Sequence, residues 1–400
     1  MAATGGIPSI MEETKRFRRA GRLDRLPPYL FVEIDRAKRA LVERGVDLVD
    51  LGIGDPDLPT PPEVVEALRR ACENPAAHRY PSQRGDPSLR AAIAAWLERR
   101  HGVAVDPDRE VLVLIGTKEG LGHLPLAAVD AGSTALVPDP AYPVYQAAVW
   151  LAGGEVVPLP LREERGFLPR IEGLDDATLE TASLLVLNYP NNPTGAVADG
   201  ALFREAVDLA SRRGLLVVND AAYAELCFDG PAVSLLETPG AREVGVEFHS
   251  FSKTFNMTGW RVGFVVGSPD ALDALAAVKS NVDSGVFTAV QRAAEAALAL
   301  PDERIRQQVD VYRRRRDTLV DGLAEAGWHL PRPRAAFYVW SRIPTDEGSA
   351  EFAARVLRDA HVVVTPGVGF GVEGEGYVRM ALTAPEERVA EAVRRIRSIL

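Results

Sequence analysis

Lys253 is the residue whose setting most strongly suggests chemistry. It lies in the segment SFSKTFNMTGWRVGF (250–264), after an apolar strand-like run and among hydroxyl side chains, with Arg261 eight residues later. A lysine held away from water there would be partly neutral, as it must be to act as a nucleophile toward a carbonyl carbon. The alternative is an ordinary surface lysine, since buried unpaired lysines are rare. Other motifs must decide between the two.

Asp220 and Tyr223 form the second motif, NDAAY at 219–223, which closes the apolar run GLLVV. A carboxylate at the end of a strand could pair with a cationic ring nitrogen, and Tyr223 could donate a hydrogen bond to a ring oxygen. The alternative for Asp220 is a helix N-cap. Both interpretations stay open at this point.

Two turn segments follow other predicted strands. NYPNNPTG (188–195) is typical of a tight turn, in which an asparagine amide held by the next proline could also bind a cofactor oxygen. GTKEG (116–120) opens a helix, and the backbone N–H groups at such a start can bind a phosphate. Taken alone, each segment is equally consistent with a purely structural turn.

Tyr142 and Arg379 complete the set. Tyr142 stands between two prolines in PDPAYPVY and could stack on a flat heterocycle, although a core or surface tyrosine is the simpler interpretation. Arg379 interrupts the apolar run GYVRMALT and needs an anionic partner there. A planar carboxylate of a substrate or a structural salt bridge would each serve.

The elements that must position these residues alternate between short apolar runs and amphipathic stretches. Such alternation indicates an α/β fold with a mostly parallel sheet, in which ligands bind at the carboxyl ends of the strands. The predicted strands span 110–116, 133–139, 182–188, 214–220, 245–251 and 261–267. After about residue 300 a long charged helix, FYVW and VVVTP predict a separate α+β domain, which we expect the N-terminal segment to join.

Composition excludes several classes of protein. The 46 basic and 56 acidic residues give a net charge of −10, which argues against nucleic acid or an anionic membrane as the main partner. Cys72 and Cys227 lack neighbouring metal ligands, and no histidine pair has metal-binding spacing, so neither a disulfide framework nor a metal site is predicted. No run suggests a membrane span or a secretory signal, and we expect a cytoplasmic protein.

Together these motifs resemble the class I/II aminotransferases of fold type I, which use pyridoxal 5′-phosphate (PLP). The resemblance rests on the order and spacing of N-P-T-G, D-x-x-Y, S-x-S-K and the late arginine, and it runs from about Leu26 to the C-terminus. It implies a large domain over residues 51–299, with a mostly parallel seven-stranded sheet, and a smaller α+β domain formed by residues 1–50 and 300–400.

The resemblance also implies roles for single residues. Lys253 would carry PLP as a Schiff base and move the proton, Asp220 would bind the ring nitrogen, and Tyr223 would bind the phenolate oxygen. The remaining cofactor contacts would be Gly116, Thr117, Lys118, Ser250, Ser252 and Arg261 around the phosphate, Tyr142 on the ring and Asn192 at the phenolate oxygen. Arg379 would bind the substrate α-carboxylate, with Gly54 and Asn192 beside it. Tyr80 would reach the phosphate of a neighbouring subunit, which implies a homodimer with shared active sites.

Within the family, whole segments are most similar to the LL-diaminopimelate aminotransferases, among them LPPYLFVEID, LGIGDPDLPTP, HSFSKTFNMTGWRVG and VVVTPGVGFGVEGEGYVRMALT. That subgroup moves an amino group between glutamate/2-oxoglutarate and LL-2,6-diaminopimelate/tetrahydrodipicolinate, in lysine and cell-wall precursor synthesis. The resemblance implies ping-pong kinetics, because one cofactor stores the amino group between two half-reactions.

Three other functions are compatible with this fold, and the first two stay open. The same catalytic residues would serve an aminotransferase acting on alanine, aspartate, glutamate or succinyldiaminopimelate. A PLP-dependent β-lyase uses the same fold. A PLP-sensing module of a transcription regulator would need a helix-turn-helix domain, for which the roughly 25 residues before LPPYLF are too few.

Overall fold

The computed structural model describes residues 17, 19–26 and 30–400. Its strands are β1 (Val49–Asp50), β2 (Val111–Leu114), β3 (Thr134–Asp139), β4 (Glu155–Pro160), β5 (Ala182–Leu187), β6 (Leu216–Asp220), β7 (Gly245–Ser250), β8 (Gly263–Gly267), β9 (Tyr338–Arg342), β10 (Val362–Val363), β11 (Thr365–Pro366) and β12 (Tyr377–Ala381). Its α-helices are α1 (Leu30–Glu43), α2 (Pro62–Cys72), α3 (Pro87–His101), α4 (Thr117–Ala128), α5 (Val144–Ala152), α6 (Asp176–Thr181), α7 (Gly200–Arg213), α8 (Ala241–Val244), α9 (Phe251–Thr254), α10 (Pro269–Val282), α11 (Thr288–Leu298), α12 (Asp302–Ala324), α13 (Ser349–Ala360) and α14 (Glu386–Arg397).

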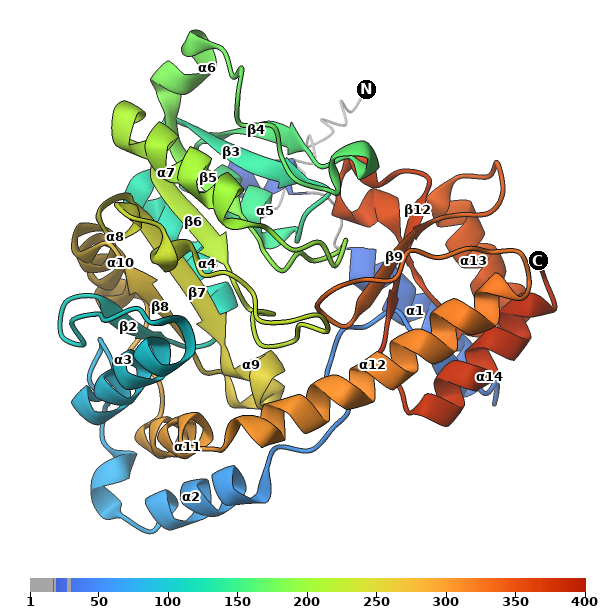
Figure 1. Ribbon diagram of the computed structural model, residues 1–400, viewed down its shortest axis with the longest axis horizontal. Coiled ribbons are helices and arrows are strands. Elements are labelled where there is room, and N and C mark those ends of the chain that lie inside the picture. The colour runs from blue at the N-terminus through green and yellow to red at the C-terminus, as the bar shows by residue number, and fades with distance from the viewer. Residues whose placement is uncertain (1–16, 18, 27–29) are drawn as a thin grey trace, which may run out of the picture.

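A seven-stranded sheet in the order β2-β8-β7-β6-β5-β3-β4 forms the centre of the larger part of the molecule (Figure 1). Only β8 runs antiparallel to its neighbours, β2 and β7, so the sheet is mostly parallel, as predicted. All six predicted strands are confirmed. The resemblance implies a seventh strand without giving its residues; it is β4, which lies at the edge of the sheet and pairs with β3.

Helices cover both faces of this sheet. Leu184 and Val186 of β5 point into a core with α4, α5 and α10, whereas Leu185 and Leu187 point into a second core with α3 and α7. Successive residues of a strand face opposite sides, so a strand covered on both faces must be apolar throughout. This explains the continuous apolar runs in the sequence.

A second group of elements contains the three-stranded antiparallel sheet β11-β12-β9, the pair β1-β10 and helices α13 and α14 (Figure 1). Val49 of β1 pairs with Val362 of β10, so the described end of the N-terminal segment lies beside a C-terminal strand. The domain boundaries at residues 50/51 and 299/300 stay a prediction. Residues 1–16, 18 and 27–29 of the predicted small domain, including the start of LPPYLFVEID, lie outside the described residues.

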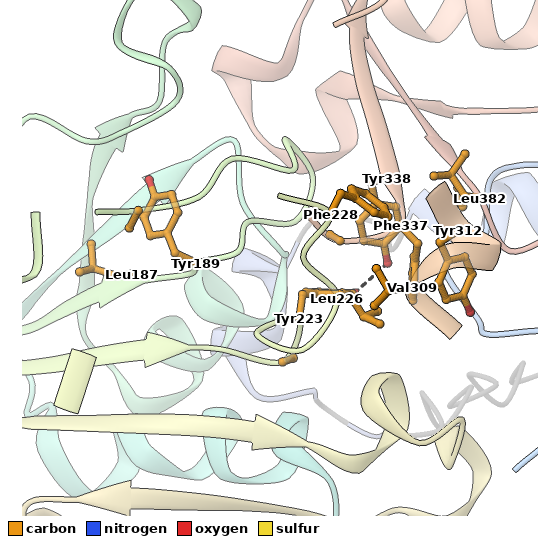
Figure 2. Packing of buried hydrophobic residues seen from close by; sticks show 14 of the residues in the cluster. Leu187, Tyr189, Tyr223, Leu226, Phe228, Val309, Tyr312, Phe337, Tyr338 and Leu382 are labelled. Carbon is orange, nitrogen blue, oxygen red and sulfur yellow. Dashed lines mark hydrogen bonds between the residues drawn. The ribbon is translucent and has the colours of Figure 1, made fainter. Parts of the chain in front are cut away.

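The long helix α12 runs between the two groups of elements (Figure 1). Figure 2 shows Tyr312 of this helix beside Phe337 and Tyr338, and the rings of Tyr312 and Phe337 lie 5.3 Å apart. Arg315 of α12 forms two hydrogen bonds with the carboxylate of Asp57, at 2.7 and 2.8 Å. These contacts hold the loop that contains Gly54 against the junction of the two sheets.

Candidate active site

A cavity of about 390 Å³ lies where the strands β2, β5, β6 and β7 end. Because β8 runs in the opposite direction, Arg261 before its amino end lies at the same edge of the sheet. The cavity is lined by Ile53, Gly54, Asp55, Thr117, Lys118, Tyr142, Tyr145, Asn188, Asn192, Asp220, Ala222, Tyr223, Ser250, Ser252, Lys253, Thr258, Arg261, Tyr338 and Arg379. Ligands bind at this edge in α/β sheets.

Lys253 lies in the one-turn helix α9, directly after β7. Its Nζ donates a hydrogen bond to the carbonyl oxygen of Gly54 at 3.0 Å. Burial lowers the pKa of Lys253 to about 8, although the negative charge of Asp55 opposes this shift. An amine with such a pKa is neutral in roughly a tenth of the molecules at pH 7, far more than an ordinary lysine, which suits a nucleophile and a proton carrier.

Asp220 is the last residue of β6 and its side chain is buried in the floor of the cavity. The hydroxyl of Tyr145 donates to its Oδ2 at 2.7 Å, and the amide of Ala222 donates to its Oδ1 at 3.2 Å. Burial raises the pKa of Asp220, and the hydrogen bond from Tyr145 opposes that shift. A buried carboxylate held in one orientation favours a cationic partner within the cavity.

Tyr223 and Tyr338 share a hydrogen bond between their hydroxyls at 2.8 Å. Tyr338 comes from β9, so this bond joins the end of the large sheet to the small one. A Cβ atom at Gly54 would overlap the hydroxyl of Tyr338. Gly54 is therefore required for the close approach of its loop, and its carbonyl can reach Lys253 for the same reason.

The end of the cavity near α4 has the features of an anion site. Gly116 has a φ of 73° and precedes Thr117, the first residue of α4, whose amide belongs to the free N–H groups of a helix start. A Cβ atom at Gly116 would overlap the guanidinium of Arg261, which the carbonyl of Thr258 holds at 2.9 Å. Ser250 and Ser252 add hydroxyls to the lining of the same cavity. Helix amides, hydroxyls and one arginine form a donor set suited to a phosphate.

Arg379 lies in the middle of β12 and only 3% of its surface is exposed. Nη1 donates to Oδ1 of Asn192 at 2.9 Å, and Nη2 donates to the carbonyl of Gly52 at 2.7 Å. The rings of Tyr338 and Phe370 lie 4.2 and 4.7 Å from its Cζ. These neighbours fix the guanidinium plane at the cavity, as a bidentate carboxylate site requires.

The family follows from a comparison with known proteins. The profile of the family described as Aminotransferase class I and II matches residues 46–396. The chain belongs to this family. The aminotransferase is 50% identical over 385 residues to a protein named LL-diaminopimelate aminotransferase from Desulforudis audaxviator, covering 96% of this chain and 98% of the relative.

Solved structures resemble the aminotransferase over nearly all of its length. A substrate-bound BacF structure from Bacillus subtilis has a TM-score of 0.94 at 40% identity, covering 96% of this chain and 98% of that one. A probable N-succinyldiaminopimelate aminotransferase from Thermus thermophilus has a TM-score of 0.87 at 41% identity, covering 93% of this chain and 100% of that one. The fold is thus that of the PLP-dependent aminotransferases.

The aminotransferase is a transaminase whose cofactor is PLP. The cavity fits that cofactor in the chemistry of its donor groups. A phosphate suits the end formed by Gly116 and Arg261, a cationic ring nitrogen suits the buried carboxylate of Asp220, and an aldehyde carbon suits the amine of Lys253.

All predicted site residues except Gly116 and Tyr80 line the cavity. Gly116 lies directly behind it, against Arg261. Tyr80 is 90% exposed and lies outside the cavity of the single chain, so its predicted contact with a neighbouring subunit stays a prediction.

Sequence reasoning missed Tyr145, Asn188 and Tyr338. Asn188 donates to the backbone carbonyl of Asp220 at 2.6 Å and accepts the amide of Asn192 at 2.9 Å, so it ties two predicted site segments together. For Asn188 the available signal was its position at the end of a predicted strand, beside the motif that contains Asn192. Tyr145 lies in the same motif as Tyr142, and Tyr338 lies in FYVW, a segment that indicated only the second domain.

Arg379→Lys is expected to weaken amino-acid binding far more than it lowers the maximal rate. Lysine keeps the charge but loses the planar fork, so one charge-assisted hydrogen bond of about 1.5–3 kcal/mol is lost. The half-saturating concentration of glutamate should therefore rise about 10- to 150-fold in stopped-flow half-reactions. Arg342→Lys is the matched control, because Arg342 lies in neighbouring β9 and pairs with Glu163 outside the cavity. Equal effects of the two substitutions would contradict the assignment.

No helix in the described residues combines the length and the apolar character needed to cross a membrane.

Proposed function

We propose that the aminotransferase moves an amino group between LL-2,6-diaminopimelate/tetrahydrodipicolinate and glutamate/2-oxoglutarate by a ping-pong mechanism. The observation that carries this proposal is the 50% identity over 96% of the chain to a relative that bears the name LL-diaminopimelate aminotransferase. On this proposal the enzyme acts in the synthesis of lysine and cell-wall precursors, in the cytoplasm.

The charges of the cavity support a substrate with a second amino-acid end. Beyond Lys253, Asp220, Arg261 and Arg379, which we assign to the cofactor and the α-carboxylate, the described residues that line the cavity include one more acid, Asp55, and one more base, Lys118. The phosphate contact predicted for Lys118 is made mainly by its backbone amide, so the role proposed here concerns its side chain. The distal end of LL-diaminopimelate carries one ammonium and one carboxylate. A cavity with a further group of each sign suits that end better than it suits the methyl group of alanine.

In the proposed mechanism Lys253 holds and moves the proton. When bound, PLP accepts the amino group of one substrate, withdraws electrons from the carbon that loses its proton, and passes the amino group to a 2-oxo acid. The neutral amine of Lys253 takes the α-proton and returns it at the cofactor side. Because burial lowers the pKa of Lys253 to about 8, its amine can both accept and release a proton near neutral pH.

The other residues bind and orient. Asp220 holds the ring nitrogen in its cationic form, while Tyr145 keeps the carboxylate in one orientation. Arg379 binds the α-carboxylate, and its bond to Asn192 couples substrate and cofactor contacts. Tyr142 covers the ring. The substrate and the amine of Lys253 are thereby held close together. The proton is then transferred within one complex, and no separate collision of the two groups is needed.

We also propose a homodimer in which Tyr80 contributes to the neighbouring active site. Tyr80 is exposed two residues after the short helix Pro75–His78, where a second copy of the chain can reach it. Tyr80→Phe tests the contact, because it keeps the ring and removes the hydroxyl that would reach the phosphate.

A half-reaction screen tests the substrate. The purified holoenzyme is mixed separately with LL-diaminopimelate, glutamate, aspartate and alanine, and the absorbance of the cofactor is followed as it takes up the amino group. We expect fast conversion with LL-diaminopimelate and glutamate and slow conversion with aspartate and alanine.

A preference for alanine or aspartate would overturn the substrate proposal and leave the family and cofactor unchanged. The structural relative named probable N-succinyldiaminopimelate aminotransferase, at 41% identity, favours a second candidate, N-succinyl-LL-diaminopimelate. That compound belongs in the same screen, and faster conversion of it than of LL-diaminopimelate would select the second candidate. Pyruvate release from a cysteine thioether would indicate a β-lyase.

A further inference from the structure

Asp139 joins the two parts of the molecule beside the cavity. It is the last residue of β3, and its carboxylate accepts hydrogen bonds from the amides of Val372 and Glu373, both at 3.2 Å. These amides start the short 3-10 helix Val372–Gly374, and helix-start amides need acceptors. The residue before that helix, Gly371, has no side chain to supply one. The acceptor therefore comes from the large sheet instead.

The close fit at this contact depends on Gly371. Its φ is 137°, a conformation that favours glycine, and a Cβ atom there would overlap the carboxylate of Asp139. Burial raises the pKa of Asp139, and the two amide hydrogen bonds oppose that shift. The carboxylate is thus half-buried and held by a partner from the other part of the molecule.

A third hydrogen bond extends this contact toward the cavity. The amide of Ala141 donates to the carbonyl of Phe370 at 2.8 Å. The next residue after Ala141 is Tyr142, and the ring of Phe370 lies 4.7 Å from the guanidinium carbon of Arg379. The segment 139–141 and the segment 370–373 therefore connect a residue that covers the cofactor with a residue that binds the substrate.

We propose that Asp139 is a positioning residue that sets the placement of Tyr142 relative to Arg379. This inference rests on the proposed roles of those two residues. Asp139 itself does not line the cavity, so it acts through the segments that it joins. The geometry of α-carboxylate binding then depends on a hydrogen-bonded contact outside the active site.

Asp139→Ala is expected to fold, because other contacts join the same two parts. Glu163 accepts hydrogen bonds from Arg342 at 2.8 Å and from Tyr377 at 2.9 Å. Asp199→Ala is the matched control. Asp199 also accepts two helix-start amides, those of Ala201 and Leu202, but it does so within the large part of the molecule.

The experiment compares the two variants as holoenzymes in the glutamate half-reaction. Asp139→Ala should raise the half-saturating glutamate concentration about tenfold, the scale of one hydrogen bond to a charged group, with little change in the maximal rate. Asp199→Ala should leave both values unchanged. Hydrogen–deuterium exchange of the apoprotein gives a second readout: only Asp139→Ala should speed exchange at Val372 and Glu373.

Equal half-saturating concentrations in the two variants would overturn the proposal, even if both lose thermal stability. Asp139→Asn keeps one acceptor oxygen and should give an intermediate value; it replaces the alanine variant if that protein does not fold. If the wild type fails to convert LL-diaminopimelate, the substrate proposal fails, whereas the Asp139 comparison still runs with glutamate or another amino donor that converts.

Discussion

Lys253→Ala is expected to abolish nearly all transamination while leaving a folded protein. The substitution removes the amine that we assign both to attachment of the cofactor and to the proton transfer, and general acid–base catalysis alone contributes about 10²- to 10⁴-fold. Folding should survive, because within the described part of the chain Nζ makes a single hydrogen bond, to the carbonyl of Gly54. The checks are the half-reaction rate with glutamate, the visible absorbance of the bound cofactor, and the melting temperature.

Lysine labelling provides the control for this prediction. After reduction with borohydride, the mass of the cofactor should be found on the peptide that contains Lys253. The peptides that contain Lys118, in the same cavity, and Lys279, buried in an ion pair with Glu119, should stay unmodified. A full rate in Lys253→Ala, or labelling at Lys118 instead, would remove Lys253 from the mechanism.

The pKa of Lys253 adds a pH dependence to the same experiment. Burial lowers this pKa from its ordinary range to about 8, so the neutral amine becomes the main form above that pH. The rate at which apoprotein attaches PLP should therefore rise with pH and level off above about 8. A rise that continues to the ordinary lysine range would show that the amine is exposed to water.

The grouping of the candidate residues in one cavity was predictable because most of them follow strands. Asp220, Asn192, Gly116 and Lys253 each follow an apolar run within a few residues, and parallel strands bring such positions to one edge of the sheet. Arg379, although it comes from the other sheet, was also predicted, because an arginine within an apolar strand needs a partner. Local sequence therefore contained most of the information about the cavity.

The missed features depend on contacts between distant segments. Strand β4 lies at the edge of the sheet, contains Pro158 and Pro160, and has several exposed residues, so it lacks the continuous apolar run of the central strands. An edge strand tolerates prolines that a central strand does not. Tyr338 reaches the cavity because β9 lies close to the segment that follows β6, which no local pattern predicts. Asp139 resembles an ordinary turn residue until its partner helix, more than 200 residues later, is in place.

Asp220→Asn is expected to lower the half-reaction rate by about 100- to 1000-fold, the scale for one preorganised electrostatic contact in a buried site. Asparagine has nearly the same shape as aspartate but carries no charge, so it cannot hold a cationic ring nitrogen. Without that cation, less of the negative charge that develops on the reacting carbon can be withdrawn. The measurement is the single-turnover rate with glutamate, with cofactor affinity determined separately by titration of the apoprotein.

Two further variants separate this charge effect from burial and from orientation. Glu247→Gln removes another buried carboxylate, one that lies in β7 of the same sheet and outside the cavity. It should lower the stability of the protein and leave the half-reaction rate nearly unchanged.

Tyr145→Phe removes the hydrogen bond that Tyr145 donates to Asp220, and this bond lowers the pKa of the Asp220 carboxyl. Its loss should raise the pKa, so the acid limb of the pH–rate profile should move to higher pH. If Asp220→Asn reacts as fast as Glu247→Gln, the charge at Asp220 is not used in the reaction. A pH profile of Tyr145→Phe that coincides with the wild type would mean that the tyrosine only fills space.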